Sequence, residues 1–131
     1  MRVEGPIPML KVKDFGKTLA FYRDDLGMKV LNLMEDKGRP FWACLGTKAR
    51  DQVMLYTQMA GLKGRENNHT IYYLKPDDVK ALHARLKRRG RKVSDLGVTV
   101  YGMREFCLKD PDGRQLTFGQ PTDDPPDCKK E

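Results

Sequence analysis

The stretch YGMREFCLKDPDGRQLTFGQ, residues 101–120, decides how this chain folds. At its centre lies the turn sequence DPDG, residues 110–113. Its proline presets φ at the second position, its second aspartate can bond its own backbone, and its glycine accepts positive φ. Short runs of alternating character flank the turn, at residues 104–109 and 114–118. We therefore predict a β-hairpin.

The pattern of this hairpin occurs a second time, in FWACLGTKARDQVMLYTQ at residues 41–58. Both copies belong to a longer repeat, in which six identical residues recur 63 positions apart. The pairs are Asp14 and Asp77, Leu19 and Leu82, Gly27 and Gly90, Val30 and Val93, Cys44 and Cys107, and Gln52 and Gln115. A period this long, with β-α-β-β-β in each copy, implies two paired modules. We predict an α+β fold in which two paired βαβββ modules form curved antiparallel sheets around a groove.

Turn residues and composition divide the chain into four segments. We expect the first βαβββ module at residues 1–58, a linker at 59–68, the second module at 69–120 and a flexible tail at 121–131. The tail is rich in proline and charge, which is typical of a frayed terminus.

Each module is expected to contain one helix, which follows the first strand in the sequence. Asp14 is a suitable N-cap for the first helix, and the second is expected to begin at Pro76 or Asp77. Residues 38–40, Gly-Arg-Pro, are expected to turn the chain between two strands. Residues 91–94 are expected to form a strand that leads into the hairpin.

Charge is concentrated in one part of the chain. The formal net charge is +7, from 25 basic and 18 acidic residues. Residues 75–92 alone carry eight basic and two acidic side chains. This run indicates either a patch for nucleic acid or phosphate, or the solvated face of a surface helix. No aromatic residue interleaves the basic ones, so nucleic-acid binding is the weaker alternative.

The sequence has no apolar run near the ~20 residues that span a bilayer. Its three cysteines form no CxxC pair and no even disulfide framework. We expect a cytoplasmic protein with free thiols and no membrane partner.

Alternation along the strands assigns each residue to a face. The apolar set Val53, Leu55, Leu116 and Phe118 is expected to pack on the helices. The alternate set, which includes Gln52, should then line the groove. Extended to the other strands, the groove set comprises Ile7, Met9, Trp42, Cys44, Met54, Tyr56, His69, Ile71, Tyr73, Glu105, Cys107, Gln115 and Thr117.

Four stretches resemble the glyoxalase/bleomycin-resistance/dioxygenase superfamily, also called vicinal oxygen chelate proteins. They are MLKVKD (9–14), LAFYRDDLGMKV (19–30), GMREF (102–106) and DPDGRQLTF (110–118). GMREF just before DPDG is more similar to the drug-sequestering branch than to the glyoxalases. The resemblance implies a homodimer whose grooves bind small molecules, with a divalent metal in the enzymes and none in the antibiotic-binding proteins.

The resemblance maps the metal-ligand positions of the enzymes onto four residues here. They fall on Ile7, Met54, Thr117 and, if one residue is inserted before the second helix, His69. Only His69 can ligate as an imidazole, and one residue of four does not make a metal site. We expect no metal or other cofactor, lean against catalysis, and interpret His69 as a hydrogen-bonding group of the groove. Glu105 lies outside these positions, where an ion pair or an edge hydrogen bond is expected.

The predicted ligand site combines aromatic and polarizable surface with a few orienting polar groups. Its residues are Trp42, Met54, Tyr56, His69, Tyr73, Tyr101, Glu105, Gln115 and Thr117. We therefore predict a metal-free, drug-sequestering-like protein whose unknown small-molecule ligand is flat and partly apolar. Two alternatives stay open. The first is a divergent metal-dependent lyase or dioxygenase, and in the second the aromatic residues fill a core or a dimer contact.

Overall fold

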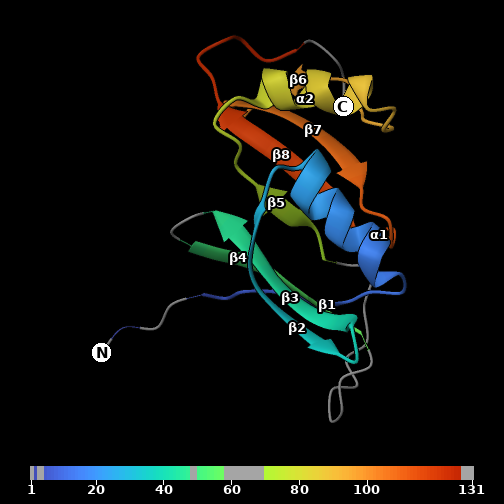
Figure 1. The fold of residues 1–131 in the computed structure, drawn as a ribbon. Coiled ribbons are helices and arrows are strands. Elements are labelled where there is room, and N and C mark those ends of the chain that lie inside the picture. The colour runs from blue at the N-terminus through green and yellow to red at the C-terminus, as the bar shows by residue number, and fades with distance from the viewer. Residues whose placement is uncertain (1, 3–4, 48–49, 58–69, 128–131) are drawn as a thin grey trace. The chain divides into compact units, whose positions relative to one another are not determined.

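The chain divides into two compact units, Met1–Asn67 and Asn68–Glu131. Their four-stranded sheets have equivalent strand orders, β1-β4-β3-β2 in the first and β5-β8-β7-β6 in the second (Figure 1). This matching topology confirms the predicted pair of βαβββ modules in an α+β fold, while the groove stays a prediction. The computed structural model describes residues 2, 5–47, 50–57 and 70–127, and the predicted linker lies outside them.

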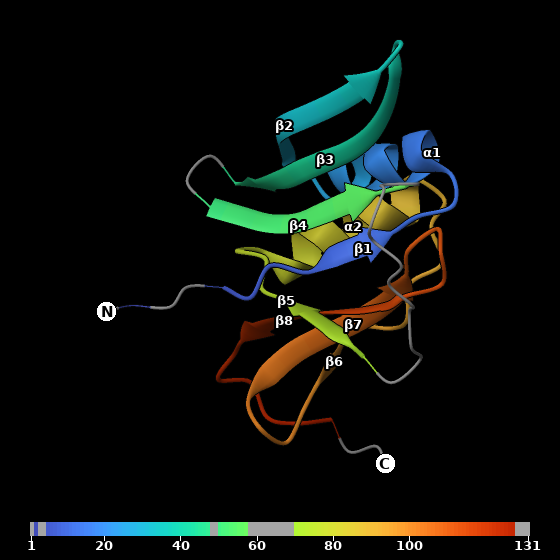
Figure 2. The ribbon, with the colours of Figure 1, turned by 90° about the horizontal axis from the view of Figure 1, so that it is seen from below.

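The first unit is a mixed sheet with a helical segment after its first strand. Its elements are β1 (Met9–Lys11), α1 (Phe15–Ala20), a π-helical turn η1 (Phe21–Asp25), β2 (Lys29–Asp36), β3 (Arg39–Thr47) and β4 (Arg50–Tyr56). β1 pairs in parallel with β4, beside which β3 and β2 follow in antiparallel order (Figure 2).

The second unit repeats this arrangement. It contains β5 (Tyr72–Leu74), α2 (Val79–Arg88), β6 (Gly97–Val98), β7 (Met103–Lys109) and β8 (Gln115–Pro121). β5 pairs in parallel with β8, and β7 is antiparallel to both β8 and β6. The prediction of purely antiparallel sheets is therefore wrong. In the first unit, the helical crossover from β1 to β2 makes these two strands parallel. β2, β3 and β4 then alternate in direction, so β4 runs parallel to β1 and pairs with it, as β8 does with β5 in the second unit.

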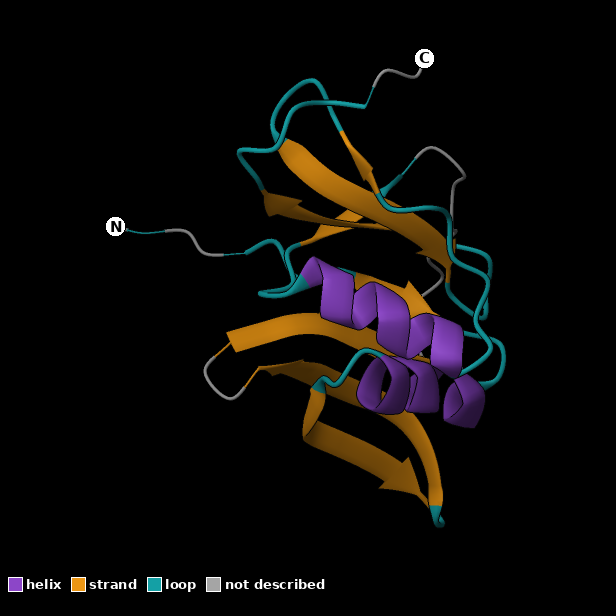
Figure 3. Ribbon diagram, turned by 90° about the horizontal axis from the view of Figure 1, so that it is seen from above, coloured by secondary structure: helices purple, strands orange, loops and turns teal. Residues whose placement is uncertain are grey.

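The helix faces of the sheets form the cores. α1 contacts β3 and β4, and α2 contacts β7 and β8 (Figure 3). Phe106 and Phe118 stack with their ring centroids 5.1 Å apart, and His83 of α2 lies edge-on to Phe106 at 4.9 Å. His83 is thus packed against the core of the second unit. The four residues that alternation predicted for the helix face are all buried: Val53, Leu55, Leu116 and Phe118.

The two helical segments begin alike but differ by one residue in length. Asp14 caps α1 by accepting a hydrogen bond from the Lys17 amide at 3.1 Å. Asp78 caps α2 by accepting from the Ala81 amide at 3.0 Å. The predicted start at Pro76 or Asp77 is therefore two or three residues early, because α2 begins at Val79, directly after the Asp78 cap.

The extra residue of the first helical segment is absorbed by η1. There the amide of Leu26 donates to the carbonyl of Phe21, five residues back, at 3.1 Å. Gly27 and Gly90, which follow the two segments, both have φ +79°. The repeat is consequently offset by 64 residues at the caps and by 63 after the glycines.

Two connections differ from those expected. The turn between β2 and β3 is Lys37-Gly38, with φ +53° and +79°, and Arg39 already pairs with Asp36. A two-residue hairpin loop needs two such positive φ values, so the turn lies before residues 39–40. Residues 91–94 form no strand: Ser94 bonds the backbone of Cys107, and pairing with β7 resumes only at β6.

The DPDG hairpin is confirmed, with a different capping residue. Gly113 has φ +88°, as expected. The carboxylate that bonds the backbone belongs to Asp110 rather than Asp112: its Oδ1 accepts from the amides of Asp112 and Arg114, both at 2.9 Å. Its Oδ2 pairs with the guanidinium of Arg114 at 3.0 Å, and both side chains are buried.

The residues expected to form the flexible tail are bonded to the second unit as far as the structure describes them. Pro121 belongs to β8. The amide of Thr122 donates to the carbonyl of Gly102 at 3.0 Å, and Asp124 pairs with Arg104. Asp127 exchanges hydrogen bonds with the backbone of Val98. Polar side chains and backbone bonds therefore tie residues 121–127 to β6, β7 and Gly102.

Candidate functional site

The second sheet has one face covered by α2 and another with mixed polar character. Along β8, Leu116 and Phe118 are buried on the α2 side, whereas Thr117 is half-buried on the other face. Along β7, Glu105 and Cys107 alternate with the buried Phe106 in the same way. The alternation predicted from sequence therefore holds in this sheet.

Three of the predicted site residues come together on this second face. The phenol of Tyr73, on β5, donates a hydrogen bond to Oε2 of Glu105, on β7, at 2.7 Å. The phenol of Tyr101, just before β7, donates to the same oxygen at 2.9 Å. We call these three residues the Tyr-Glu-Tyr cluster. Glu105 thus makes hydrogen bonds, as expected, but to two phenols rather than at a sheet edge.

A glycine makes this cluster possible. β8 lies between β5 and β7, so the side chain of Tyr73 must cross β8 to reach Glu105. It crosses at Gly119, the residue paired with Glu105. A Cβ atom at position 119 would overlap the Tyr73 hydroxyl and lie 2.6 Å from its ring carbon Cζ. Sequence reasoning missed Gly119, although an isolated glycine inside a strand pattern is a recognised signal of close approach.

The electrostatics of the cluster keep both phenols protonated. Burial, followed by the hydrogen bond to Glu105, raises the pKa of Tyr73 well above its usual value. The hydrogen bond to Glu105, followed by burial, raises the pKa of Tyr101. Both side chains therefore remain neutral hydrogen-bond donors throughout the physiological pH range.

A hollow of about 850 Å³ lies beside Glu105. Residues 94–100 form one wall, and β7 and β8 form the floor. Ser94 attaches the wall to the floor: its amide donates to the carbonyl of Cys107 at 2.9 Å, and its hydroxyl accepts from the Cys107 amide at 2.8 Å. Of the predicted site residues, the hollow includes Glu105, Gln115 and Thr117.

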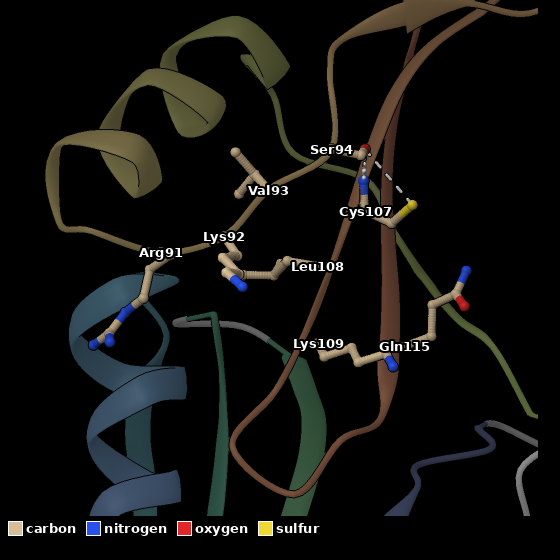
Figure 4. Close-up of a pocket in the computed structure, with 8 residues that line it drawn as sticks. All are labelled: Arg91, Lys92, Val93, Ser94, Cys107, Leu108, Lys109 and Gln115. Atoms are coloured by element: carbon tan, nitrogen blue, oxygen red, sulfur yellow. Dashed lines mark hydrogen bonds between the residues drawn. The ribbon is translucent and has the colours of Figure 1, made fainter.

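A second hollow of about 570 Å³ continues along the same strands (Figure 4). It includes Cys107 and Gln115 together with the basic residues Arg91, Lys92 and Lys109. Figure 4 shows that the Arg91 side chain points away from the Ser94–Cys107 pair. The polar group that directly contacts Cys107 is the hydroxyl of Ser94.

Trp42, Met54 and Tyr56 belong to the first unit and form a separate group there. Trp42 and Tyr56 are opposite each other on β3 and β4, and Met54 is next to Cys44 and Met9 in the same register. Tyr56 is 4% exposed, while Trp42 and Met54 are half-buried. Cys44 is also buried, and this burial raises the pKa of its thiol, which disfavours the reactive thiolate.

His69 lies outside the described residues, but the strand register corrects the mapping that selected it. Met9 pairs with Met54, and Tyr73 pairs with Thr117. The residue equivalent to Met9 is therefore Tyr73, and two residues earlier Ile7 corresponds to Ile71. The insertion lies in the first helical segment, at η1, and not before the second helix.

The four mapped positions thus become Ile7, Met54, Ile71 and Thr117. Their side chains offer one thioether and one hydroxyl, which is not a donor set for Zn²⁺, Ni²⁺ or non-haem iron. Within residues 5–47, 50–57 and 70–127, no group of three or more His, Cys, Asp or Glu side chains is placed to hold a metal ion.

The sequence matches the family model of the Glyoxalase/Bleomycin resistance protein/Dioxygenase superfamily over residues 7–118. The chain belongs to this superfamily. The match includes both units and the entire Tyr-Glu-Tyr cluster, which confirms the resemblance seen in the sequence. Comparison with curated proteins gave no match.

Solved structures of similar fold include an antibiotic-binding protein, TnmS3, from Streptomyces sp. CB03234, with 25% identity, a TM-score of 0.70, and coverage of 93% of this chain and 100% of that one. A glyoxalase/bleomycin resistance protein from the same organism has 26% identity, a TM-score of 0.67 and coverage of 87% and 97%. Lactoylglutathione lyase from Agrobacterium tumefaciens has 15% identity, a TM-score of 0.69 and coverage of 91% and 95%. At that identity the lyase shares the fold alone.

The basic run of residues 75–92 corresponds to α2 and its flanks. Its eight basic side chains are exposed, and Arg85, Lys87 and Arg88 lie in the last turn of α2. Cations there complement the negative end of the helix dipole. Among the described helices, none is long and apolar enough to cross a membrane.

Proposed function

We propose that this protein binds a small molecule on the face of its second sheet opposite α2, which we call the open face, and holds the molecule without chemical change. The observation that carries the proposal is the Tyr-Glu-Tyr cluster beside the hollow of about 850 Å³. Aromatic surface with a few fixed polar groups is typical of ligand sites, and this volume is in their usual range of roughly 300–1,000 Å³. Superfamily membership and the likeness to TnmS3 support the same function.

We further propose that binding needs no metal. The superfamily positions that carry metal ligands in its enzymes are here occupied by Ile7, Met54, Ile71 and Thr117. Aliphatic side chains donate no lone pair, so a divalent ion would lack most of its coordination shell. Sequestration needs only affinity, and it therefore tolerates the loss of these ligands where a lyase or dioxygenase does not.

The protein is expected to act as a homodimer in the cytoplasm. The superfamily resemblance implies the dimer, and the apolar exposure of β2 supports it, since Leu31, Leu33 and Met34 are each 38–40% exposed. β2 is an edge strand, and an exposed apolar edge is typical of a surface covered by a partner. Light scattering at several protein concentrations tests whether the molar mass is that of a dimer.

Binding is tested with flat aromatic probes on chelator-treated protein. We would titrate an anthraquinone sulfonate, an acridine and 1-naphthol, and follow binding by calorimetry together with the NMR resonances of the second unit. We expect at least one probe to bind at micromolar concentration and to be recovered unchanged by mass spectrometry. If none of the three probes binds, the proposal is wrong.

The same preparation tests the enzymatic alternative. A divergent metalloenzyme would copurify with a stoichiometric divalent metal, and His69→Ala would lose it. Elemental analysis of wild type and His69→Ala therefore separates the two functions. Probe binding that requires added metal, or conversion of the probe, would favour the enzyme.

A further inference from the structure

We propose that the Tyr-Glu-Tyr cluster recognises a positively charged alkylammonium group on the ligand. This inference rests on the proposed function and assigns a ligand chemistry to the same face. The cluster is the place where the open face of the second sheet carries a carboxylate between two aromatic side chains.

The carboxylate of Glu105 has unused hydrogen-bonding capacity. Both phenols donate to the same oxygen, Oε2. Within the described residues, Oε1 accepts no hydrogen bond, although a carboxylate has about four acceptor positions. One oxygen of a half-buried anion is therefore available to accept from a ligand.

No lysine or arginine in the described part of the chain neutralises this anion. The adjacent Arg104 points to the other side of the strand, where it pairs with Asp124. The phenols of Tyr73 and Tyr101 stabilise the carboxylate by hydrogen bonds but carry no charge. A ligand cation would thus supply the missing countercharge.

The two tyrosine rings add a second attraction for a cation. Their hydroxyls are held on Glu105, so the rings lie beside the carboxylate, and the residues remain 44% and 66% exposed. Aromatic faces attract alkylammonium groups, and the attraction grows as water is excluded. An anion and two rings together favour a quaternary ammonium over a neutral group of equal size.

The remaining part of such a ligand has room next to the cation. Glu105 belongs both to the cluster and to the lining of the larger hollow, whose floor includes Thr117 and Gln115. The net charge of +7 repels cations at long range. Recognition of a cation must therefore come from short-range contacts with carboxylates, and Glu105 is the one that two aromatic rings flank, while Asp95 and Asp127 also line the hollow.

The test compares two probes of equal shape, choline and its neutral isostere 3,3-dimethylbutan-1-ol, by NMR titration of the full chain. We expect choline to shift the resonances around Glu105, Thr117 and Gly119 saturably, and the alcohol to bind at least tenfold more weakly. Equal binding of the two probes overturns the proposal, and this comparison requires no variant.

Variants then assign the effect to Glu105. We expect Glu105→Gln, which keeps the shape but removes the charge, to weaken choline binding about tenfold. The matched control Glu35→Gln, on the exposed end of β2, should leave binding unchanged. Unchanged choline affinity in a folded Glu105→Gln protein overturns the assignment.

The titration includes 1-naphthol as a probe that needs no charge recognition. If 1-naphthol shifts resonances of this face and choline does not, the cation proposal is wrong while small-molecule binding stands. If no probe shifts any resonance of the face, both proposals are wrong.

Discussion

Tyr73 reaches Glu105 only because residue 119 has no side chain. The phenol crosses β8 above Gly119 and ends 2.7 Å from the Glu105 carboxylate, where a Cβ atom at position 119 would overlap it. Gly119, on the strand between β5 and β7, thus determines the geometry of the candidate site.

Gly119→Ala should therefore displace Tyr73 and destabilise the protein. The added methyl group must push the ring away from β8 and break its hydrogen bond to Glu105, and the loss of such a bond costs about 0.5–1.5 kcal/mol. Urea denaturation measures the loss, and NMR of the Tyr73 ring reports its displacement.

The control for this substitution is Gly16→Ala in α1. A Cβ atom there would meet only the Asp14 carboxylate, at 3.9 Å. Alanine is the better helix former, so Gly16→Ala should leave stability unchanged or raise it by up to about 1 kcal/mol. Equal destabilisation by both variants would contradict the steric role of Gly119.

The raised pKa values of Tyr73 and Tyr101 predict a loss of stability at alkaline pH. An unfolded tyrosine has a pKa of 10.0, and both folded-state values are higher. The folded protein therefore holds these protons where the unfolded chain has released them. The stabilisation is complete below pH 10 and falls as the pH rises through the folded-state values.

Thermal unfolding between pH 9 and 11.5 measures this dependence. Lysines also titrate in this range, so the comparison is between wild type and Tyr73→Phe, which lacks the phenol. We expect the wild type to lose stability more steeply. Parallel curves for the two proteins would show that Tyr73 titrates normally.

The buried ion pair in the DPDG turn should be critical for stability. The side chains of Asp110 and Arg114 are 0% and 4% exposed, and the Asp110 carboxylate also accepts from two backbone amides. Asp110→Ala leaves a buried guanidinium without this partner. We expect a loss of about 3–5 kcal/mol in the free energy of unfolding.

Asp24→Ala provides the comparison for that variant. It removes an equivalent contact between Asp24 and Arg23. The side chains of Arg23 and Asp24 are 47% and 46% exposed. Solvent screens such a pair, so the midpoint of urea unfolding should hardly change. A similar loss in both variants would mean that burial is not what makes Asp110 important.

Gln120 should control the start of α2. Its amide oxygen accepts from the Val79 amide at 2.7 Å, and its amide nitrogen donates to the Asp77 carbonyl at 2.8 Å. Gln120→Ala should cost about 1–2 kcal/mol, as the loss of a helix cap does. Hydrogen exchange of the first α2 amides should accelerate in this variant and remain unchanged in Gln52→Ala, on β4.

Much of the fold follows from local chemistry. The DPDG turn, the Asp14 cap and the strand alternation each depend on a few adjacent residues, and each was predicted correctly. The errors arose where a distant partner decides the outcome. Gln120 of β8 bonds the Val79 amide and the Asp77 carbonyl at the start of α2, and residues 121–127 are held by groups on β6 and β7.

For the candidate site, alternation correctly placed Glu105, Thr117 and Tyr73 on one face of the sheet. It could not show that Tyr73 and Tyr101 share one oxygen of Glu105, because those contacts depend on strand order. Nor could it locate the one-residue insertion at η1, which lies within an otherwise regular helical pattern and moves the position equivalent to Ile7 from His69 to Ile71.

The sequence by itself determined the two βαβββ modules, their helix faces and the superfamily, because turns, caps and strand period are written in neighbouring residues. The tertiary structure alone decided that β5 and β7 lie on either side of β8, which brings Tyr73 to Glu105 across Gly119. The physical reason is that hydrogen bonding between strands, and not sequence distance, sets which side chains share a surface.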